Sequence, residues 1–492
     1  MNIVLRQLLI GASGAAILSG CMVGPNFHTP APPEVDRYTP APLPNATSPG
    51  SSEAAERFVP GAPVQAGWWK LFGSPQLDVL EQEALKNNSD LHAAQAALRQ
   101  AHEVYLAERA SLFPTVQLAA NAMRARNSAT IAPPLADNSE IYSLFTAQLN
   151  VAYTPDVFGG ERRQIESVGA QAENQRFQTE AVYLTLTANV ANTVLQLAGL
   201  NAQLDATRST VEADRKVLET TRHMQALGEA SSADVAAAGT TLAQAQQLLP
   251  PIQKQIHQQT DLLAILVGRP PSNAPTDRFD ISGFRLPEEL PVSLPSDLVR
   301  QRPDILAAEA NLHSASALVG VAIAARLPSF PIEGSAGSAS GTVAGLFSSE
   351  NGLWSITGSV AQTVFDAGAL RHKQAAAYAA LDQAKAQYRS AVLGGLQNTA
   401  DALQVIIDDA DLLRHAQAAE TAAAQSLQIA QTQFGQGQVG ALSVLNAEAA
   451  SGQAEVSLAQ ARAARYADAV ALFQALGGGW WNRDAAATVS KP

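Results

Sequence analysis

Cysteine is almost absent from this sequence, because Cys21 is the only one in 492 residues. A single thiol cannot close a disulfide within the chain, so disulfides cannot stabilise the fold. Charged residues make up only 15% of the chain and aromatic residues only 5%. The formal net charge is -12 and no block of Lys or Arg stands out, so nucleic acid is not expected as a partner.

Long apolar runs are also missing. The run at 8–18 follows Arg6 and has the length and flanking charge of a secretory signal, and it is too short to span a bilayer. No later run reaches about eighteen apolar residues, which argues against a membrane-spanning helix. Ala and Gln recur throughout the chain, a composition that suits closely packed helices.

The single cysteine ends the motif Leu18-Ser19-Gly20-Cys21, which resembles the lipobox of bacterial lipoproteins. We therefore expect a signal peptide at 1–20, and a diacylglycerol thioether with an acylated amine on Cys21. Several acyl chains make a stable anchor where one chain is marginal. The alternative is an ordinary signal peptide with an incidental cysteine. Met22 follows where Asp is the familiar inner-membrane retention signal, so that resemblance implies the outer membrane as the destination.

The segment 21–67 is dense in Pro, Ala and Ser. Such a segment has little to bury, so the lipid-anchored segment is expected to run extended along something larger. Folded structure is expected to begin at Trp68-Trp69.

An internal repeat organises the rest of the chain. Asn88-Ser89-Asp90-Leu91 opens a helical pattern and has a counterpart in Arg302-Pro303-Asp304-Ile305. The same shift carries Phe113-Pro114 onto Leu327-Pro328. Two further pairs follow in order: Asp156 to Gly160 with Arg163 against Phe365 to Gly368 with Arg371, and Gly228 with Val235 against Gly437 with Val444. The chain is therefore interpreted as two similar halves, 68–268 and 295–476, with a connector at 269–294 and a tail at 477–492.

Each half predicts one β-hairpin, at about 113–155 and about 327–365. Apolar and polar residues alternate over 145–153 and again around 354–360, which is typical of a strand with one apolar and one polar face. The second hairpin includes a Gly/Ser-rich loop at 334–345. Five positions on the polar faces are candidates to line a pore: Thr146, Gln148, Asn150, Thr357 and Ser359.

Very long helices are expected after each hairpin, at about 161–268 and about 369–476. A proline-free stretch of about 65 residues forms a rod of about 100 Å, and such a rod must pack along others as a coiled coil or bundle. The rods turn back at 227–231 and 435–440. Glycines inside the rods weaken the helix and predict some bending: Gly199, Gly394 and Gly395.

Four strands in one chain cannot close a membrane barrel, because the smallest bacterial barrels need about eight. An open sheet with an apolar face would leave unpaired edges in lipid. Several copies must therefore share one barrel: two would give eight strands and a filled interior, and three would give twelve and room for a lumen. A soluble hairpin that packs on helices is the alternative interpretation.

The sequence resembles the TolC-like outer membrane efflux proteins, and among them the lipid-anchored NodT branch, along essentially its whole length. The matching stretches, in chain order, are 21–27, Trp68-Trp69 with Phe72, 294–305, Ala308-Glu309, Leu327-Pro328 and 475–480. The resemblance implies a mainly α fold with a small membrane β-barrel portion. It implies a homotrimer whose twelve-stranded β-barrel is continuous with a periplasmic α-helical barrel.

The same resemblance implies a transport function and no catalytic activity. The protein would be the exit duct of a tripartite pump that exports small molecules such as drugs. Its partners would be two further copies of itself, outer-membrane lipid, a periplasmic membrane-fusion adaptor and an inner-membrane pump of the resistance-nodulation-division (RND) type. No cofactor is expected beyond the lipid on Cys21, and no metal site.

The family closes its duct partly with acidic residues just after the turn glycines. By that spacing the gate positions are Asp234, Ser443 and Asn446, and only the first is charged, so a weak acidic ring is expected. The alternative for Asp234 is a helix-start residue favoured by the helix dipole. Seven residues at the turns are candidates for adaptor contact, with capping of the turn as the alternative for each: Leu227, Gly228, Glu229, Ser231, Phe434, Gly437 and Val439.

Other patterns point to no further function. The run 435–440 fits G-x-G-x-x-G, but no strand precedes it, so a turn between helices is favoured over a dinucleotide site. Four acidic residues are interpreted either as duct lining or as a solvated helix face: Asp401, Asp408, Asp409 and Asp411. The rival class is a periplasmic coiled-coil structural lipoprotein with no channel, which would not need the alternating segments. A lipid-anchored enzyme lacks any candidate set of catalytic residues.

Overall fold

A computed structural model of the chain describes residues 22–48, 55–128, 130 and 140–483. The predicted signal peptide and Cys21 lie outside the described residues. The chain divides into two compact units. We call the first the sheet unit (Met1–Pro30, Leu98–Asn174 and Ala308–Tyr388) and the second the helical unit (Ala31–Ala97, Gln175–Ala307 and Arg389–Pro492).

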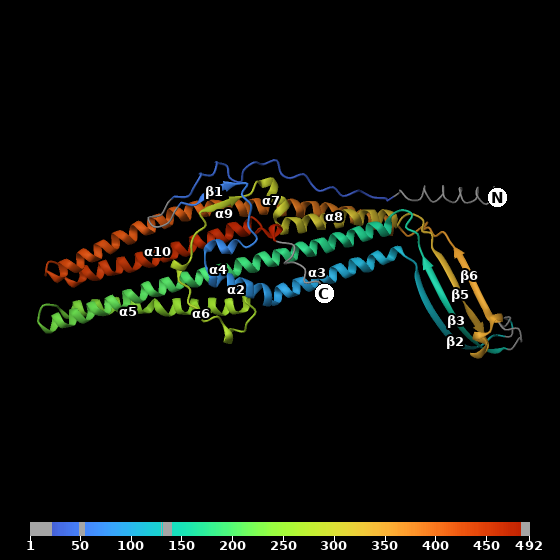
Figure 1. Cartoon of the computed structure of the whole chain (residues 1–492), viewed down its shortest axis with the longest axis horizontal. Helices are drawn as coiled ribbons and strands as arrows, with labels where there is room; N and C mark the ends of the chain where they lie inside the picture. The colour runs from blue at the N-terminus through green and yellow to red at the C-terminus, as the bar shows by residue number, and fades with distance from the viewer. Residues whose placement is uncertain (1–21, 49–54, 129, 131–139, 484–492) are drawn as a thin grey trace. The chain divides into compact units, whose positions relative to one another are not determined.

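The sheet unit contains an antiparallel sheet of four strands in the order β2-β3-β5-β6 (Figure 1). The strands are β2 Thr115–Arg126, β3 Ile141–Tyr153, β5 Ile332–Ser340 and β6 Gly352–Gly358. Each half of the sequence supplies one hairpin, and pairing of β3 with β5 joins the two hairpins. Among the described residues, β2 and β6 pair on one side only.

The Gly/Ser-rich run expected as a loop is largely strand β5, so that prediction was wrong. Strand pairing is made by backbone groups, and small residues let neighbouring strands approach. At Gly337 an added β-carbon would collide with the backbone of Ala147 and Gln148 in β3. The sequence pattern did not reveal this strand because glycine is depleted in strands generally.

Most regular structure is α-helical, as predicted. The helices are α2 Pro75–Asn87, α3 Ser89–Arg109, α4 Gly160–Ala226, α5 Ser232–Gln247, α6 Leu249–Leu266, α7 Pro295–Gln301, α8 Pro303–Ala324, α9 Ala369–Gly435 and α10 Ala441–Ala475. Helices α4 and α9 have 67 residues each. In the second half one helix, α10, returns, whereas in the first half the return is divided into α5 and α6. Proline stands in the first turn of α6, where the missing N–H costs little.

The described residues also form short 3-10 helices. They are η1 Trp68–Phe72, η2 Ala110–Leu112, η3 Pro271–Asn273, η4 Ile281–Gly283, η5 Ala344–Phe347, η6 Ser349–Asn351 and η7 Trp480–Asn482.

Regular structure begins earlier than Trp68, contrary to our expectation. Strand β1, Arg57–Pro60, lies in the segment expected to be only extended, and it pairs in parallel with β4, Glu289–Val292, in the connector. The pattern missed both strands because each has only four residues.

The core of the helical unit joins the start and the end of the chain. Trp68 is fully buried and stacks on Phe473 of α10, with ring centroids 5.3 Å apart. Phe72, also fully buried, packs at 6.1 Å from the ring of Tyr466. The Trp68-Trp69 motif therefore anchors α10 to the η1 turn.

The repeated motif at Asn88 and Arg302 makes the same type of contact in both halves. The side chain of Asn88 donates from Nδ2 to the carbonyl of Leu266 at 3.0 Å, and Arg302 donates from Nη1 to the carbonyl of Ala475 at 2.9 Å. The two acceptors are the last residues of α6 and α10, where carbonyls lack partners within the helix. The repeat thus links the start of one helix to the end of another twice.

Helix α8 has the length and mean hydropathy, 1.3, of a membrane-crossing helix, but this is weak evidence. Its residues His313 and Ser314 hydrogen bond to Glu166 and Ser167 of α4. Such polar contacts to a neighbouring helix are those of a helix packed inside a protein.

Gly199, expected to mark a bend, serves a packing role within the continuous helix α4. A β-carbon at Gly199 would lie 2.5 Å from the β-carbon of Ala463 in α10, so the missing side chain allows close approach of the two helices. At Gly394 in α9 an added β-carbon meets nothing within 4 Å.

The two glycines make a matched test of this packing. We expect Gly199→Ala to lower the free energy of unfolding by about 1–3 kcal/mol through overpacking. Gly394→Ala is expected to raise it by up to about 1 kcal/mol, because alanine is the better helix former. Thermal unfolding followed by circular dichroism in detergent measures both, and shifts of the same sign and size would contradict the packing role.

Candidate functional site

The two faces of the four-stranded sheet have opposite chemistry. Residues directly opposite each other in an antiparallel pair lie on the same face, and neighbours along a strand alternate. One face carries amides and hydroxyls: Gln117, Asn121, Thr146, Gln148, Asn150, Ser335, Ser355 and Thr357. The other carries large apolar side chains: Val116, Leu118, Phe145, Leu149, Val151, Ile332, Trp354 and Ile356.

The apolar face is exposed within the chain. Leu118 is 77% exposed, Trp354 77% and Ile356 75%. Large contiguous apolar surfaces of this kind normally contact a partner or a membrane.

Four of the five predicted lumen residues lie on the polar face of the sheet. Thr146, Gln148 and Asn150 alternate along β3, and Gln148 donates to Asn150 at 2.9 Å. Thr357 stands opposite Glu333 of β5 on that face. Ser359 lies just beyond β6, where its backbone N–H donates to the carbonyl of Pro331 at 3.0 Å.

Sequence reasoning missed the part of this face that β5 supplies. The hydroxyls of Ser335 in β5 and Ser355 in β6 lie 2.8 Å apart. The signal for β5 was weak, because its small side chains show little hydrophobic contrast between alternate positions.

The ends of the helical hairpins form a second candidate region. A small apolar cluster, which we call the tip cluster, joins α4, α5 and α10: Val217, Leu218, Ala238, Val444 and Leu445. Val235 packs against it from α5, so the residues seven positions after Gly228 and Gly437 meet in one cluster. Phe434 also packs against it, which gives this proposed adaptor contact a structural role.

The other predicted tip residues are at the turns themselves. Leu227 is 62% exposed and Glu229 is exposed, whereas Val439 is half-buried. Gly228 and Gly437 have φ of +82° and +70°, which favours glycine at both turns.

The predicted gate residues lie near the helix turns, Asp234 on α5 and Ser443 and Asn446 on α10. Asp234 and Ser231 form a capping box at the start of α5: the Asp234 carboxylate accepts from the Ser231 N–H at 2.8 Å, and the Ser231 hydroxyl accepts from the Asp234 N–H at 3.2 Å. The hydrogen bond from the Ser231 hydroxyl to the carboxylate is the main reason that the pKa of Asp234 is lowered. Ser443 and Asn446 are exposed on α10, and no hydrogen bond described here joins them to Asp234.

A buried acidic pair, missed from the sequence, lies beside the tip cluster. Asp214 of α4 is 1% exposed and Glu448 of α10 is 5% exposed. A cavity of about 520 Å³ reaches Glu448 and is also lined by Lys216, Gln431 and Phe434. Burial, and then repulsion from Asp214, raise the pKa of Glu448 to about 7. The pair was missed because the two acids are far apart in the sequence.

This pair predicts a pH dependence of stability. Because the folded-state pKa of Glu448 is raised, its stabilising contribution is complete below the unfolded pKa of about 4.3 and is lost as pH rises through about 7. We expect Glu448→Gln to remove this loss, so the variant gains melting temperature relative to wild type between about pH 5 and 8. Glu229→Gln, at an exposed tip position, is the control. A melting temperature that depends on pH as in wild type would contradict the assignment.

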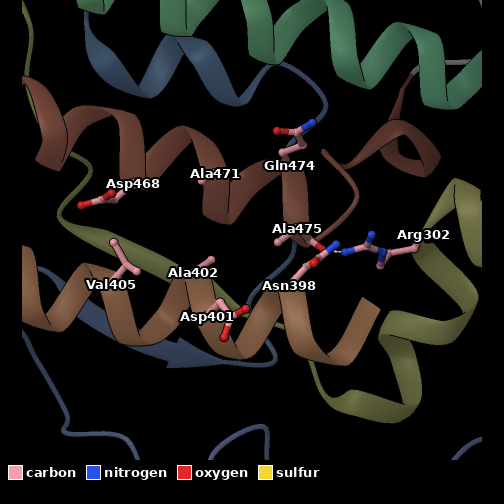
Figure 2. Close-up of a pocket in the computed structure, with 9 residues that line it drawn as sticks. All are labelled: Arg302, Asn398, Asp401, Ala402, Val405, Asp468, Ala471, Gln474 and Ala475. Atoms are coloured by element: carbon pink, nitrogen blue, oxygen red, sulfur yellow. Dashed lines mark hydrogen bonds between the residues drawn. The ribbon is translucent and has the colours of Figure 1, made fainter. Parts of the chain in front are cut away.

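A second cavity in the helical unit, of about 410 Å³, lies between α9 and α10 (Figure 2). Asp401 and Asp468 line it together with Arg302, whose guanidinium is directed to the Ala475 carbonyl. Burial, with repulsion from Asp409, raises the pKa of Asp468. Among the described residues no group of three His, Cys, Asp or Glu could hold a metal. Duct lining by the predicted acidic residues stays a prediction.

A two-faced sheet with open edges, together with hairpins of very long helices, defines a protomer of a TolC-like channel. The family model for outer membrane efflux proteins matches residues 80–269 and 294–478, so the chain belongs to this family.

Relatives and solved structures agree with this family. The chain is 32% identical over 456 residues to the pyoverdine export outer membrane protein OpmQ of Pseudomonas putida, covering 92% of this chain and 94% of that protein. It is 29% identical to the toluene efflux pump outer membrane protein TtgC of Pseudomonas putida, covering 97% and 96%. The outer-membrane channel OprN is similar in structure, with a TM-score of 0.83, 28% identity, and coverage of 94% of this chain and 100% of that one.

These comparisons confirm three predictions. The TolC-like fold class, the efflux channel function and the outer-membrane location all hold. The family consists of channel proteins.

Proposed function

We propose that this chain forms the outer-membrane exit duct of a tripartite efflux pump that passes small molecules to the exterior. The observation that carries this proposal is the exposed apolar face of the sheet opposite a face of amides and hydroxyls. The apolar face fits lipid, and the polar face fits a water-filled lumen. A periplasmic structural rod would gain nothing from either.

The open edges supply the argument for a homotrimer. In hydrocarbon the free backbone groups of β2 and β6 must be paired, so β6 of one copy joins β2 of the next. Three copies with four strands each give twelve strands, enough for an open lumen, whereas two would give a filled barrel.

The remaining partners are proposed from the family and from the helix ends. A periplasmic adaptor would contact the turns, where five of the seven candidates, Leu227 and Glu229 among them, are exposed. An inner-membrane pump of RND type would supply the energy. The two relatives described above are named for pyoverdine and toluene, so the class of cargo proposed here is small molecules in general. A diacylglyceryl group on Cys21 would anchor each copy to the outer membrane.

Two adjacent residues of β3 test the assignment of the faces. Leu149→Arg puts a charge on the lipid face and is expected to cost about 2–4 kcal/mol near the bilayer midplane, so outer-membrane trimers should be strongly reduced. Gln148→Arg puts the same charge on the lumen face and should leave trimers intact while changing ion selectivity. Heat-modifiable bands from outer-membrane extracts and single-channel conductance measure the two effects. Equal loss of trimers in both variants would contradict the proposal.

The gate role of Asp234 has its own test. If three copies of this carboxylate close the duct, Asp234→Asn is expected to weaken block of the channel by divalent cations, because asparagine is uncharged. The amide oxygen of asparagine can still accept in the cap, which keeps the turn folded. Single-channel recordings at graded divalent concentrations measure the block, with Glu229→Gln as control. Unchanged block would leave Asp234 with a capping role only.

A further inference from the structure

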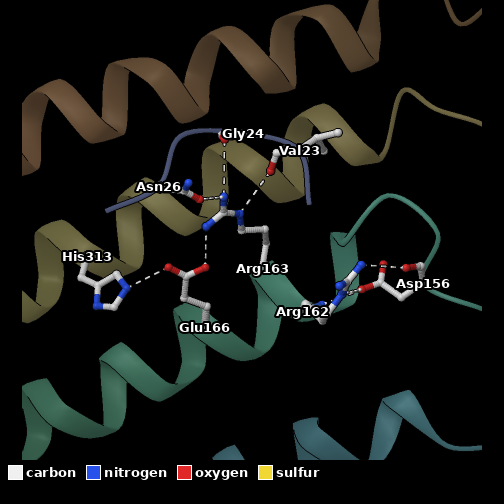
Figure 3. A network of polar contacts seen from close by, with 8 residues as sticks. All are labelled: Val23, Gly24, Asn26, Asp156, Arg162, Arg163, Glu166 and His313. Carbon is white, nitrogen blue, oxygen red and sulfur yellow. Dashed lines mark hydrogen bonds and ion pairs between the residues drawn. The ribbon is translucent and has the colours of Figure 1, made fainter. Parts of the chain in front are cut away.

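The residues that directly follow Cys21 bind to a site formed by polar side chains of the sheet unit (Figure 3). Its centre is Arg163 of α4, whose side chain is only 1% exposed. Its guanidinium donates from Nε to the carbonyl of Val23 at 3.1 Å, and from Nη2 to the carbonyl of Gly24 at 3.4 Å and to Oδ1 of Asn26 at 2.7 Å. We call residues 22–27 the strap.

A second contact to the strap comes through Glu166 and His313. Arg163 donates from Nη1 to Oε2 of Glu166 at 2.7 Å, and Oε1 of Glu166 lies 2.9 Å from Nε2 of His313. The His313 ring stacks on the ring of Phe27, with centroids 4.3 Å apart and planes 15° apart. Arg163 therefore contacts the strap through hydrogen bonds, and His313 contacts it through ring stacking.

The backbone of the strap fits a groove shaped by glycines. Gly24 has φ +94°, and an added β-carbon there would collide with the backbone of Gly320 in α8. A β-carbon on Gly159 would collide with Met22. The N–H of Val23 donates to the carbonyl of Phe158 at 3.0 Å, which fixes the strap beside the link between β3 and α4.

The internal repeat shows that the strap site is not part of the repeated fold. Arg371 stands at the position of α9 that matches Arg163 in α4, and it is exposed. A buried guanidinium is costly unless its donors are satisfied, and the strap supplies three acceptors to Arg163. The first half thus carries a buried arginine whose partners come largely from a segment that exists once per chain.

We propose that Arg163, Glu166 and His313 form a receptor for the strap that fixes the lipidated end of the chain beside the β3–α4 link. This rests on the proposed lipidation of Cys21. Consecutive α-carbons are about 3.8 Å apart, so the acyl-bearing residue lies within one step of Met22. The receptor places the acyl chains near the end of β3. It also keeps the residues after Cys21 from moving freely relative to the sheet unit.

Hydrogen exchange of the full-length protein in lipid nanodiscs, read by mass spectrometry, tests the receptor. In Arg163→Gln we expect amide exchange of the strap peptide to be about tenfold faster than in wild type, because the charge-assisted hydrogen bonds to it are lost. Arg371→Gln, the repeat counterpart, and Arg162→Gln, the neighbour that pairs with Asp156, should leave strap exchange unchanged. Unchanged strap exchange in Arg163→Gln would overturn the receptor.

Two further measurements distinguish loss of strap binding from unfolding of the sheet unit and from a lack of acylation. Exchange in the β3 peptide reports whether the sheet unit is still folded, and if Arg163→Gln loses it, Asn26→Ala tests the same site from the strap side. Strap exchange as slow as in wild type in that variant, with β3 protected, would also overturn the proposal. The mass of the N-terminal peptide reports acylation separately: an unmodified Cys21 would overturn the lipid placement, whereas an acylated peptide with a freely exchanging wild-type strap would overturn the receptor alone.

Discussion

The constraint on which this protein depends is that a sheet edge cannot stay unpaired in hydrocarbon. Four strands give the chain a surface for lipid and a surface for water, yet within the described part of the chain β2 and β6 each pair on one side only. No side chain can remove that cost, since it belongs to the backbone. Only further copies of the sheet can, so the membrane part is complete only in an oligomer. The small residues of β5 let it lie close to β3, because an added β-carbon at Gly337 would collide with the backbone of Ala147 and Gln148.

The internal repeat includes the hydrogen bonds that hold the helix ends as well as the helices themselves. Asn88 and Arg302 each connect the start of a helix to the last carbonyl of a returning helix. Asp156 and Asp366 each accept backbone N–H groups at the start of a 67-residue helix, α4 or α9. The position of a long helix is not set by its own backbone hydrogen bonds, so contacts at its ends must hold it in place. The two halves hold their helix ends with the same residue type at Asp156 and Asp366, and with different types at Asn88 and Arg302.

The two halves differ in three features: the environment of the matched arginines, the returning helices and the buried acids. Arg163 is buried under the strap, and its counterpart Arg371 is exposed. The return from the first turn is broken into α5 and α6, and the return from the second is continuous. Buried acids also sit asymmetrically: Asp214 of the first half meets Glu448 of the second. Two buried acids close to each other cost stability when both are charged, which makes Asp214 and Glu448 sensitive to pH.

The sequence by itself determined the features that are local. Alternation of apolar and polar residues over 145–153 predicts a strand with two different faces. The proline-free stretches predict long helices, and the glycines predict the turns. These predictions are possible because the side-chain period and the backbone freedom of glycine are properties of the local sequence. Only the tertiary structure decided what is non-local: that the Gly/Ser-rich run is a strand between β3 and β6, that β1 pairs with β4, and that Asp214 lies near Glu448. Those pairings depend on which segments meet, and no period along one segment encodes its distant neighbour.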